Sequence, residues 1–364
     1  MCLFLVVECG AMVRLQRRLG LPIAYHTEPT GSTSWLSPWP EATQIRFAAY
    51  LTAAGTVVHL HMEAEMGMTL DWLGCATFRV TIDGLVVFLD AYLDRVPAAP
   101  PIGLSSAEVS RADFVLVGHS HFDHLAGADV IARNTGVRII GSNETYHVMR
   151  DHDVPREQLL PSQGGERHRL ADGVTVRVFP SLHTCLWTGL PGGMGDVCTG
   201  DTGLTEDDRR ALMAERSPFA AVFRAQTEVD RVALEHMRAA TGSFRDGGPL
   251  VYLIETPYGS IFYQDSSGCW SGVLRDIRAD VAILAAAGRA NHDGEPFQGA
   301  LAQFIAMEAS LLGARTVVVD HHDNWLGRPD FQPMDLAPLR EELAPSQAEL
   351  LEMGYLEAVP LLTG

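Results

Sequence analysis

The chain has 364 residues, a formal charge of −18 and 47% hydrophobic residues, which is enough apolar material for a large core and unlike a disordered protein. All 27 basic residues are arginines, and the lack of lysine excludes Schiff-base enzymes, Walker A ATPases and protein kinases. The acidic balance also argues against a nucleic-acid partner, because an acidic surface repels a phosphate backbone.

The first 65 residues differ in pattern from the rest. Residues 29–40 are rich in Pro, Ser and Gly and show no periodicity. We therefore predict a poorly ordered N-terminal extension over 1–65, followed by a domain over 66–364. The apolar run at the start precedes its arginines, which is the reverse of a signal peptide, and no apolar run reaches about 18 residues. The six cysteines form no C-x-x-C pair. We expect a cytoplasmic protein with reduced thiols and no membrane insertion.

From Met68 onward, strand patterns follow one another closely. Asp83-Gly84 predicts a tight hairpin turn, and Pro257-Tyr-Gly259 predicts a second one. The predicted strands are 70–73, 77–82, 85–89, 112–118, 137–140, 174–179, 250–255, 260–264, 281–284 and 316–319. The predicted helices lie near 127–134, 144–150 and 299–312. Strands come first with helices between them, and the pattern then repeats, which predicts two stacked sheets with helices outside.

Residues 186–248 have a different character and interrupt the strand patterns. Thr205 followed by three acidic residues is typical of a helix N-terminus, and a helical spacing of apolar residues runs on until Gly242. We interpret this stretch as a helical insertion. Two roles for it stay open: a helical pair packed on the core, or a lid over the site described next.

Four metal-binding side chains occur within six residues just after the predicted strand 112–118. They are His119, His121, Asp123 and His124. Imidazole nitrogens and carboxylate oxygens are the ligands that Zn²⁺ and related divalent ions prefer. Four such residues at this spacing are hard to explain as packing, so the sequence predicts a metal site here.

This H-x-H-x-D-H pattern resembles the signature of the metallo-β-lactamase superfamily, and the resemblance covers the chain from about residue 68. It implies an α/β (α+β) fold, a four-layer αββα sandwich. It also implies a further metal-ligating histidine after a strand, where His183 fits, and an aspartate at the end of an early strand, where Asp90 fits in a structural role.

Two ligand positions of the resemblance have competing candidates. The bridging aspartate is either Asp265 or Asp201, and we favour Asp265 because it follows a hairpin of two strong strands. The last histidine is either His321 or His322, and the register favours His321. One ion would then lie on His119, His121 and His183, and a second on Asp123, His124 and His321, with Asp265 between them.

The resemblance implies a hydrolase with two divalent ions, Zn²⁺ first and Mn²⁺ or Fe²⁺ as alternatives. A hydroxide between the ions would attack a carbonyl or phosphoryl centre of a small-molecule ester, lactone or phosphodiester. Asp123 and Asp265 would be the catalytic carboxylates, and His292 is a candidate substrate contact. The lactonase and phospholipase-D-like branches look most similar, and relatives of this kind often form homo-oligomers. The alternative is a non-catalytic metal-binding or sensory member of the same fold.

Overall fold

The computed structural model describes residues 67–217, 220–225, 227–329 and 331–362, and the backbone of three short segments nearer the start. Those segments are β1 (His26–Thr27), β2 (Thr33–Trp35) and β3 (Phe47–Ala49), and they pair as a small antiparallel sheet. The predicted extension over 1–65 otherwise lies outside the described residues. Residues from Gly67 onward make one compact unit.

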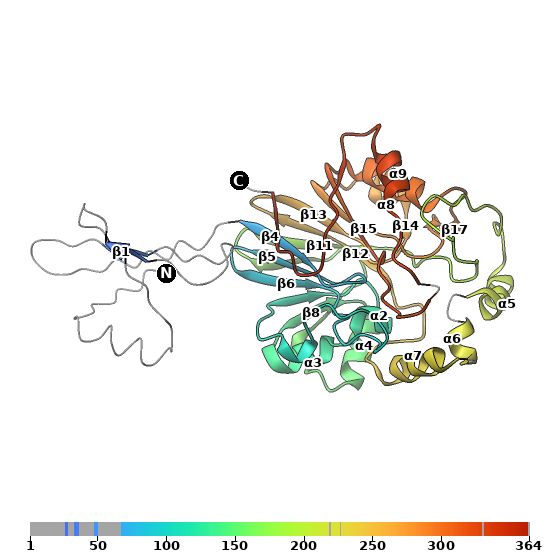
Figure 1. Cartoon of the computed structure of the whole chain (residues 1–364), viewed down its shortest axis with the longest axis horizontal. Helices are drawn as coiled ribbons and strands as arrows, with labels where there is room; N and C mark the ends of the chain where they lie inside the picture. Colours follow the sequence, from blue (N-terminus) through green and yellow to red (C-terminus); the bar gives the residue numbers. More distant parts are fainter. Residues whose placement is uncertain are drawn as a thin grey trace, which may run out of the picture. The chain divides into compact units, whose positions relative to one another are not determined.

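Two seven-stranded mixed sheets organise this unit (Figure 1). In spatial order, the first sheet holds β20 (Val359–Leu361), β4 (Met68–Trp72), β5 (Phe78–Ile82), β6 (Leu85–Leu89), β7 (Phe114–Leu116), β8 (Arg138–Gly141) and β9 (Leu159–Pro161). The second holds β10 (Arg167–Ala171), β11 (Val174–Pro180), β12 (Leu250–Thr256), β13 (Gly259–Tyr263), β15 (Val281–Ala285), β18 (Thr316–Asp320) and β19 (Glu349–Leu350). A short third sheet holds β14 (Gly268–Cys269), β16 (Asn291–His292) and β17 (Glu295–Pro296).

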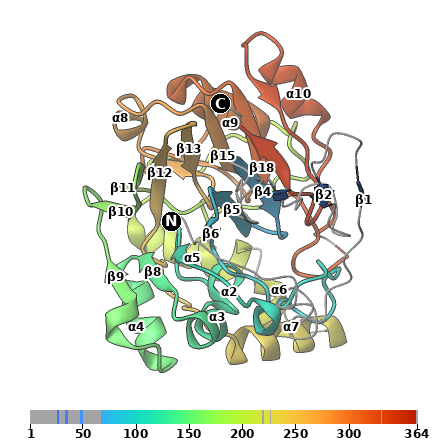
Figure 2. The same ribbon diagram turned by 90° about the vertical axis from the view of Figure 1, so that its left-hand side faces the viewer.

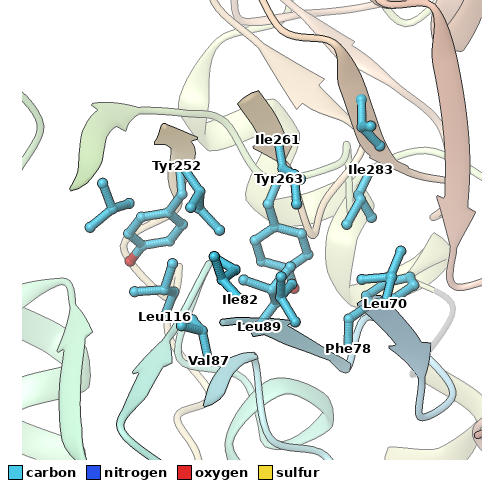
Figure 3. Packing of buried hydrophobic residues seen from close by; sticks show 14 of the residues in the cluster. Leu70, Phe78, Ile82, Val87, Leu89, Leu116, Tyr252, Ile261, Tyr263 and Ile283 are labelled. Atoms are coloured by element: carbon cyan, nitrogen blue, oxygen red, sulfur yellow. The ribbon is translucent and has the colours of Figure 1, made fainter. Parts of the chain in front are cut away.

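The two large sheets face each other across an apolar core. Strands such as β5 alternate buried and half-buried residues, so every second side chain points inward. Leu70, Phe78 and Leu89 of the first sheet meet Tyr263 and Ile283 of the second (Figure 3). Each of these side chains is almost fully buried, and burying one side chain of this size contributes about 1.5–3 kcal/mol.

Helices cover the outer faces of both sheets, as Figure 2 shows for α3 and α4 on one side and α9 and α10 on the other. The helices of the described residues are α2 (Phe122–Leu125), α3 (Ala128–Thr135), α4 (Asn143–Asp151), α5 (Glu206–Arg216), α6 (Ala220–Arg224), α7 (Glu228–Ala239), α8 (Ser271–Leu274), α9 (Leu301–Leu312) and α10 (Ala337–Leu343). Single 3₁₀ turns are η2 (Ser106–Glu108) and η3 (Arg156–Gln158). This is the predicted sandwich of two sheets with helices outside.

Some edge strands escape the sequence pattern. In β10, which follows Glu166, two of the five residues are exposed and only one is buried, because the strand lies at the sheet edge. Its sequence therefore shows no apolar alternation. In β20, Pro360 weakens the strand signal, since proline cannot donate a ladder hydrogen bond and is tolerated only at an edge.

Among the described residues, no helix is long and apolar enough to cross a bilayer.

The stretch 186–248 holds α5, α6 and α7. Thr205 and Thr227 each accept a hydrogen bond from the backbone N–H three residues on, so both hydroxyls cap the helices that follow. The α5 helix buries none of its residues, whereas α7 places Leu234 and Met237 in a cluster with Phe122 of α2. The α7 helix therefore packs beside the segment that carries the H-x-H-x-D-H motif.

Candidate metal centre

The predicted ligands lie at one shared edge of the two sheets because their strands run in the same direction. In the first sheet β6 is parallel to β7, and in the second β13, β15 and β18 are parallel. Two antiparallel steps, from β11 through β12 to β13, bring the end of β11 to this edge as well. Loops that leave the carboxyl ends of such strands converge. They carry Asp90, His119, His183, Asp265 and His321.

Five imidazoles converge here, and each has one ring nitrogen held by an acceptor. A carbonyl or carboxylate oxygen can only accept, so the proton sits on the held nitrogen and the other nitrogen keeps its lone pair. The held atoms and their acceptors are His119 Nδ1 with Asp265 Oδ2 (2.7 Å), His121 Nε2 with Arg245 O (2.6 Å), His124 Nδ1 with Asp90 Oδ2 (2.5 Å), His183 Nδ1 with Thr184 O (2.9 Å) and His321 Nδ1 with Asp320 Oδ1 (2.7 Å).

The lone-pair nitrogens gather in places where an ion would fit. His119, His121 and His183 place ligand atoms within 4.8 Å of one another, and His119 Nε2 lies 3.0 Å from His121 Nδ1. Asp123 Oδ2 lies 3.6 Å from His124 Nε2 and 3.8 Å from His321 Nε2. Histidine ligands held in this way by a carboxylate or carbonyl are the usual arrangement at protein metal sites. The donors present therefore fit divalent ions.

Burial decides the protonation of three of the five histidines. It lowers the pKa of His119 and His124 well below the usual range, and it lowers the pKa of His183 to about 4. Neutral imidazoles are the form that binds a metal ion. In the second group, burial alone would lower the pKa of His321, but Cys75, Asp123 and Asp320 beside it raise it well above the usual range. These surroundings favour a positive charge at that place.

The structure separates the competing candidates. Asp265 is buried between His119 and His124, with Oδ2 3.2 Å from His124 Nδ1, whereas Asp201 pairs with Arg216 in a loop away from the imidazoles. His321 faces Asp123, whereas His322 stacks on the Trp72 ring with centroids 4.3 Å apart. The geometry therefore groups Asp265 and His321 with the H-x-H-x-D-H residues.

A cavity of about 570 Å³ opens above these residues. Its floor is polar and its walls are largely apolar. The walls include Leu186, Leu190, Met194, Trp325, Phe331 and Met334. One arginine lines it among the described residues, Arg289, whose guanidinium is paired with Asp201 and the Gly200 carbonyl.

The positions of two residues differ from the sequence prediction. His292 is not among the described residues that line the cavity: its ring lies against Phe297 and near Asp293, on the short third sheet, so it is dropped as a substrate contact. Cys75 was missed, although its sulfur lies within 4.8 Å of ligand atoms of Asp123 and His321. The isolated cysteine in Gly74-Cys75 gives no sequence signal, because its partners lie far along the chain.

Comparisons with known proteins identify the family of this chain. A family model described as a beta-lactamase superfamily domain matches residues 86–217. A UPF0173 metal-dependent hydrolase of Pyrobaculum neutrophilum is 33% identical over 185 residues, which are 47% of this chain and 80% of that protein. This chain belongs to the metallo-β-lactamase superfamily.

Two further proteins also match this chain. A UPF0173 metal-dependent hydrolase of Anaeromyxobacter dehalogenans is 33% identical over 168 residues, 40% of this chain and 60% of that protein. Igni18, a metallo hydrolase of Ignicoccus hospitalis, superposes with a TM-score of 0.52 at 16% identity, over 82% of this chain and 99% of Igni18. At that identity Igni18 supports the metallo-β-lactamase fold alone.

Proposed function

We propose that this protein is a binuclear metal-dependent hydrolase that cleaves a small-molecule ester, lactone or phosphodiester. The observation that carries the proposal is the set of five converging imidazoles, each oriented by an acceptor on one nitrogen. One ion would lie on His119, His121 and His183, and a second on Asp123, His124 and His321. Asp265, which the sequence predicts between them, holds Nδ1 of His119. The hydrolase domain of the proposal runs over 66–364, and 186–248 is its helical insertion.

Divalent ions held there would polarise the carbonyl or phosphoryl oxygen and supply a water-derived nucleophile at neutral pH; Zn²⁺ is the first candidate. The protein's own side chains would then orient the reacting water molecule. Burial alone would raise the pKa of Asp123, but His124 and His321 hold it well below the usual range, so this side chain stays a carboxylate. It lies on the cavity floor, where it can accept the hydrogen bond that orients a water molecule.

The cavity walls favour an uncharged substrate with an apolar group over a phosphodiester. Besides the proposed ions, no free arginine of the described lining could bind a phosphate, because Arg289 is already paired with Asp201. The apolar side chains of Leu186, Trp325 and Phe331 would instead bury an acyl or alkyl group. Carbonyl esters and lactones are therefore the first substrates to try.

The test is turnover of a lactone, a β-lactam, a thioester, carboxylic esters of increasing chain length and bis-p-nitrophenyl phosphate, with Zn²⁺ or Mn²⁺. We expect hydrolysis of the lactone or of the longer esters, and little of the phosphodiester. His121→Ala should lower kcat by more than about 100-fold while the fold is kept, and His147→Ala, an exposed histidine of α4, is the matched control. No turnover on any substrate with metal fully bound would instead favour a non-catalytic metal-binding protein.

A further inference from the structure

The turn between β4 and β5 brings a thiol to the second group of ligands. β4 and β6 are both antiparallel to β5, so β4 ends at the same sheet edge as β6. Cys75 lies in this turn and its side chain is fully buried. Its Sγ and ligand atoms of Asp123 and His321 all lie within 4.8 Å of one another. The group joins three loops that are far apart in the sequence.

The backbone around Cys75 is held in an unfavourable conformation. Cys75 has φ +49°, in the left-handed region that non-glycine residues rarely adopt, and Gly74 before it has φ +83°. His321 opposite also has a positive φ, of +54°. A conformation of this kind persists only where the surroundings enforce it. The side chains of Cys75 and His321 thus lie close together on two backbone segments with unfavourable dihedral angles.

Hydrogen bonds fix the turn to the loop that carries His321. The Cys75 carbonyl accepts from the His321 backbone N–H (3.1 Å), and the Cys75 N–H donates to Asp323 Oδ1 (3.1 Å). Asp323 Oδ2 in turn accepts from Arg95 Nη2 and from the Tyr355 hydroxyl, both at 2.7 Å. The position of the thiol relative to His321 is therefore set by backbone contacts on both sides.

The two separations measured from Asp123 are those expected between donors of a single ion. Four donors placed tetrahedrally at about 2.0–2.3 Å from one zinc ion lie roughly 3.3–3.8 Å apart. Asp123 Oδ2 lies 3.6 Å from His124 Nε2 and 3.8 Å from His321 Nε2. Asp123 is thus the neighbour shared by both imidazoles, and the Cys75 sulfur lies on the side of Asp123 and His321.

We propose that Cys75 is a ligand of the second ion, completing a set of one thiolate, one carboxylate and two imidazoles with Asp123, His124 and His321. The inference rests on the proposed metal centre and adds a sulfur donor to it. The ion replaces the thiol proton, which leaves to the solvent. A thiolate selects a softer ion, so the second position takes Zn²⁺ or Co²⁺ in preference to Mn²⁺ or Mg²⁺.

The test uses the full chain loaded with Co²⁺ and, separately, with Zn²⁺. We expect a thiolate-to-Co²⁺ charge-transfer band in the near ultraviolet, and a sulfur neighbour at about 2.3 Å by X-ray absorption at the zinc edge. Cys75→Ser should remove both signals and lower affinity for the second ion by at least about 10-fold, while the first ion stays bound. Cys269→Ser, which alters another buried cysteine away from the imidazoles, should keep both signals.

The outcomes separate this inference from the proposed function. Two bound ions with nitrogen and oxygen neighbours alone, and unchanged spectra in Cys75→Ser, would show that Cys75 is a packed thiol and overturn the inference while leaving the hydrolase proposal standing. Failure of the wild-type chain to bind either ion would overturn both. If Cys75→Ser fails to fold, the sulfur signal of the wild-type protein decides by itself.

Discussion

At the scale of single residues, the site depends on side chains that orient its histidines. Asp90 is fully buried with φ +52°, and its two oxygens accept from the Gly118 N–H, from His124 Nδ1 and from the Tyr263 hydroxyl. Three donors on one carboxylate fix its orientation. Asp90 thereby sets the tautomer of His124 and points Nε2 of that ring at Asp123.

Asp90→Asn should weaken metal binding and keep the fold. Asparagine has nearly the same shape and tolerates positive φ, but its NH₂ group takes the place of one carboxylate oxygen. That NH₂ group must then face either the Gly118 N–H or the donors of His124 and Tyr263. If the amide faces His124, it forces the proton onto Nε2 and removes that ligand. We expect about 10–100-fold lower affinity for the second ion, measured by competition with a chromophoric chelator.

Asp71→Asn is the matched control for this change. Asp71 is also a buried aspartate at a sheet strand, but it pairs with Arg79 and with the Ala358 N–H, away from the histidines. It should alter stability without altering metal affinity. Equal metal affinity in Asp90→Asn and the wild-type protein would contradict the role given to Asp90.

At the scale of secondary-structure elements, the end of β7 approaches the loop after β13 more closely than any side chain would allow. A Cβ atom on Gly118 would lie 2.1 Å from Cγ of Asp265. The absence of a side chain at Gly118 thus lets the Asp265 carboxylate reach His119 and His124. Gly118 positions Asp265 across the gap between the two sheets.

Gly118→Ala should therefore displace the Asp265 carboxylate. We expect at least about 10-fold weaker metal binding and a loss of about 1–3 kcal/mol in the free energy of unfolding, since overpacking a filled core has this cost. Metal content of the purified protein and denaturant unfolding measure the two effects. Gly272→Ala is the control, because a Cβ there meets no atom within 4 Å. Normal metal content in Gly118→Ala would refute this account of the strand end.

At the scale of the whole molecule, the centre joins the two sheets. His119, His121, Asp123 and His124 follow β7 of the first sheet, while His183, Asp265 and His321 follow β11, β13 and β18 of the second. Ions bound to ligands from both sheets would cross-link them at the edge opposite the turns at Asp83-Gly84 and Pro257–Gly259. Metal binding and sandwich stability should then be coupled.

Removal of metal by a chelator should lower the melting temperature, and Zn²⁺ should restore it. A ligand present at about 100 times its Kd stabilises the folded state by roughly 2.7 kcal/mol. Differential scanning calorimetry with and without the chelator measures the shift. The His121→Ala protein should show a smaller shift than the wild-type protein. Identical melting curves for the wild-type protein before and after chelation would rule out the coupling.

The sequence by itself determined the class of fold and the main cluster of ligands. Alternating strands and the local run from His119 to His124 are short-range patterns, and the structure confirms the sandwich and brings these residues together. Local patterns suffice here because side-chain alternation and ligand spacing are properties of consecutive residues.

Only the tertiary structure decided between Asp265 and Asp201, placed His321 rather than His322 at Asp123, and brought Cys75 to the same place. The physical reason is that these contacts join strands far apart in the sequence, which meet at one edge only after both sheets have paired. The anchoring of three ring nitrogens is also a tertiary property, since the acceptors of His119, His121 and His124 lie far away in the sequence. His183 and His321 are instead held by the residue next to them.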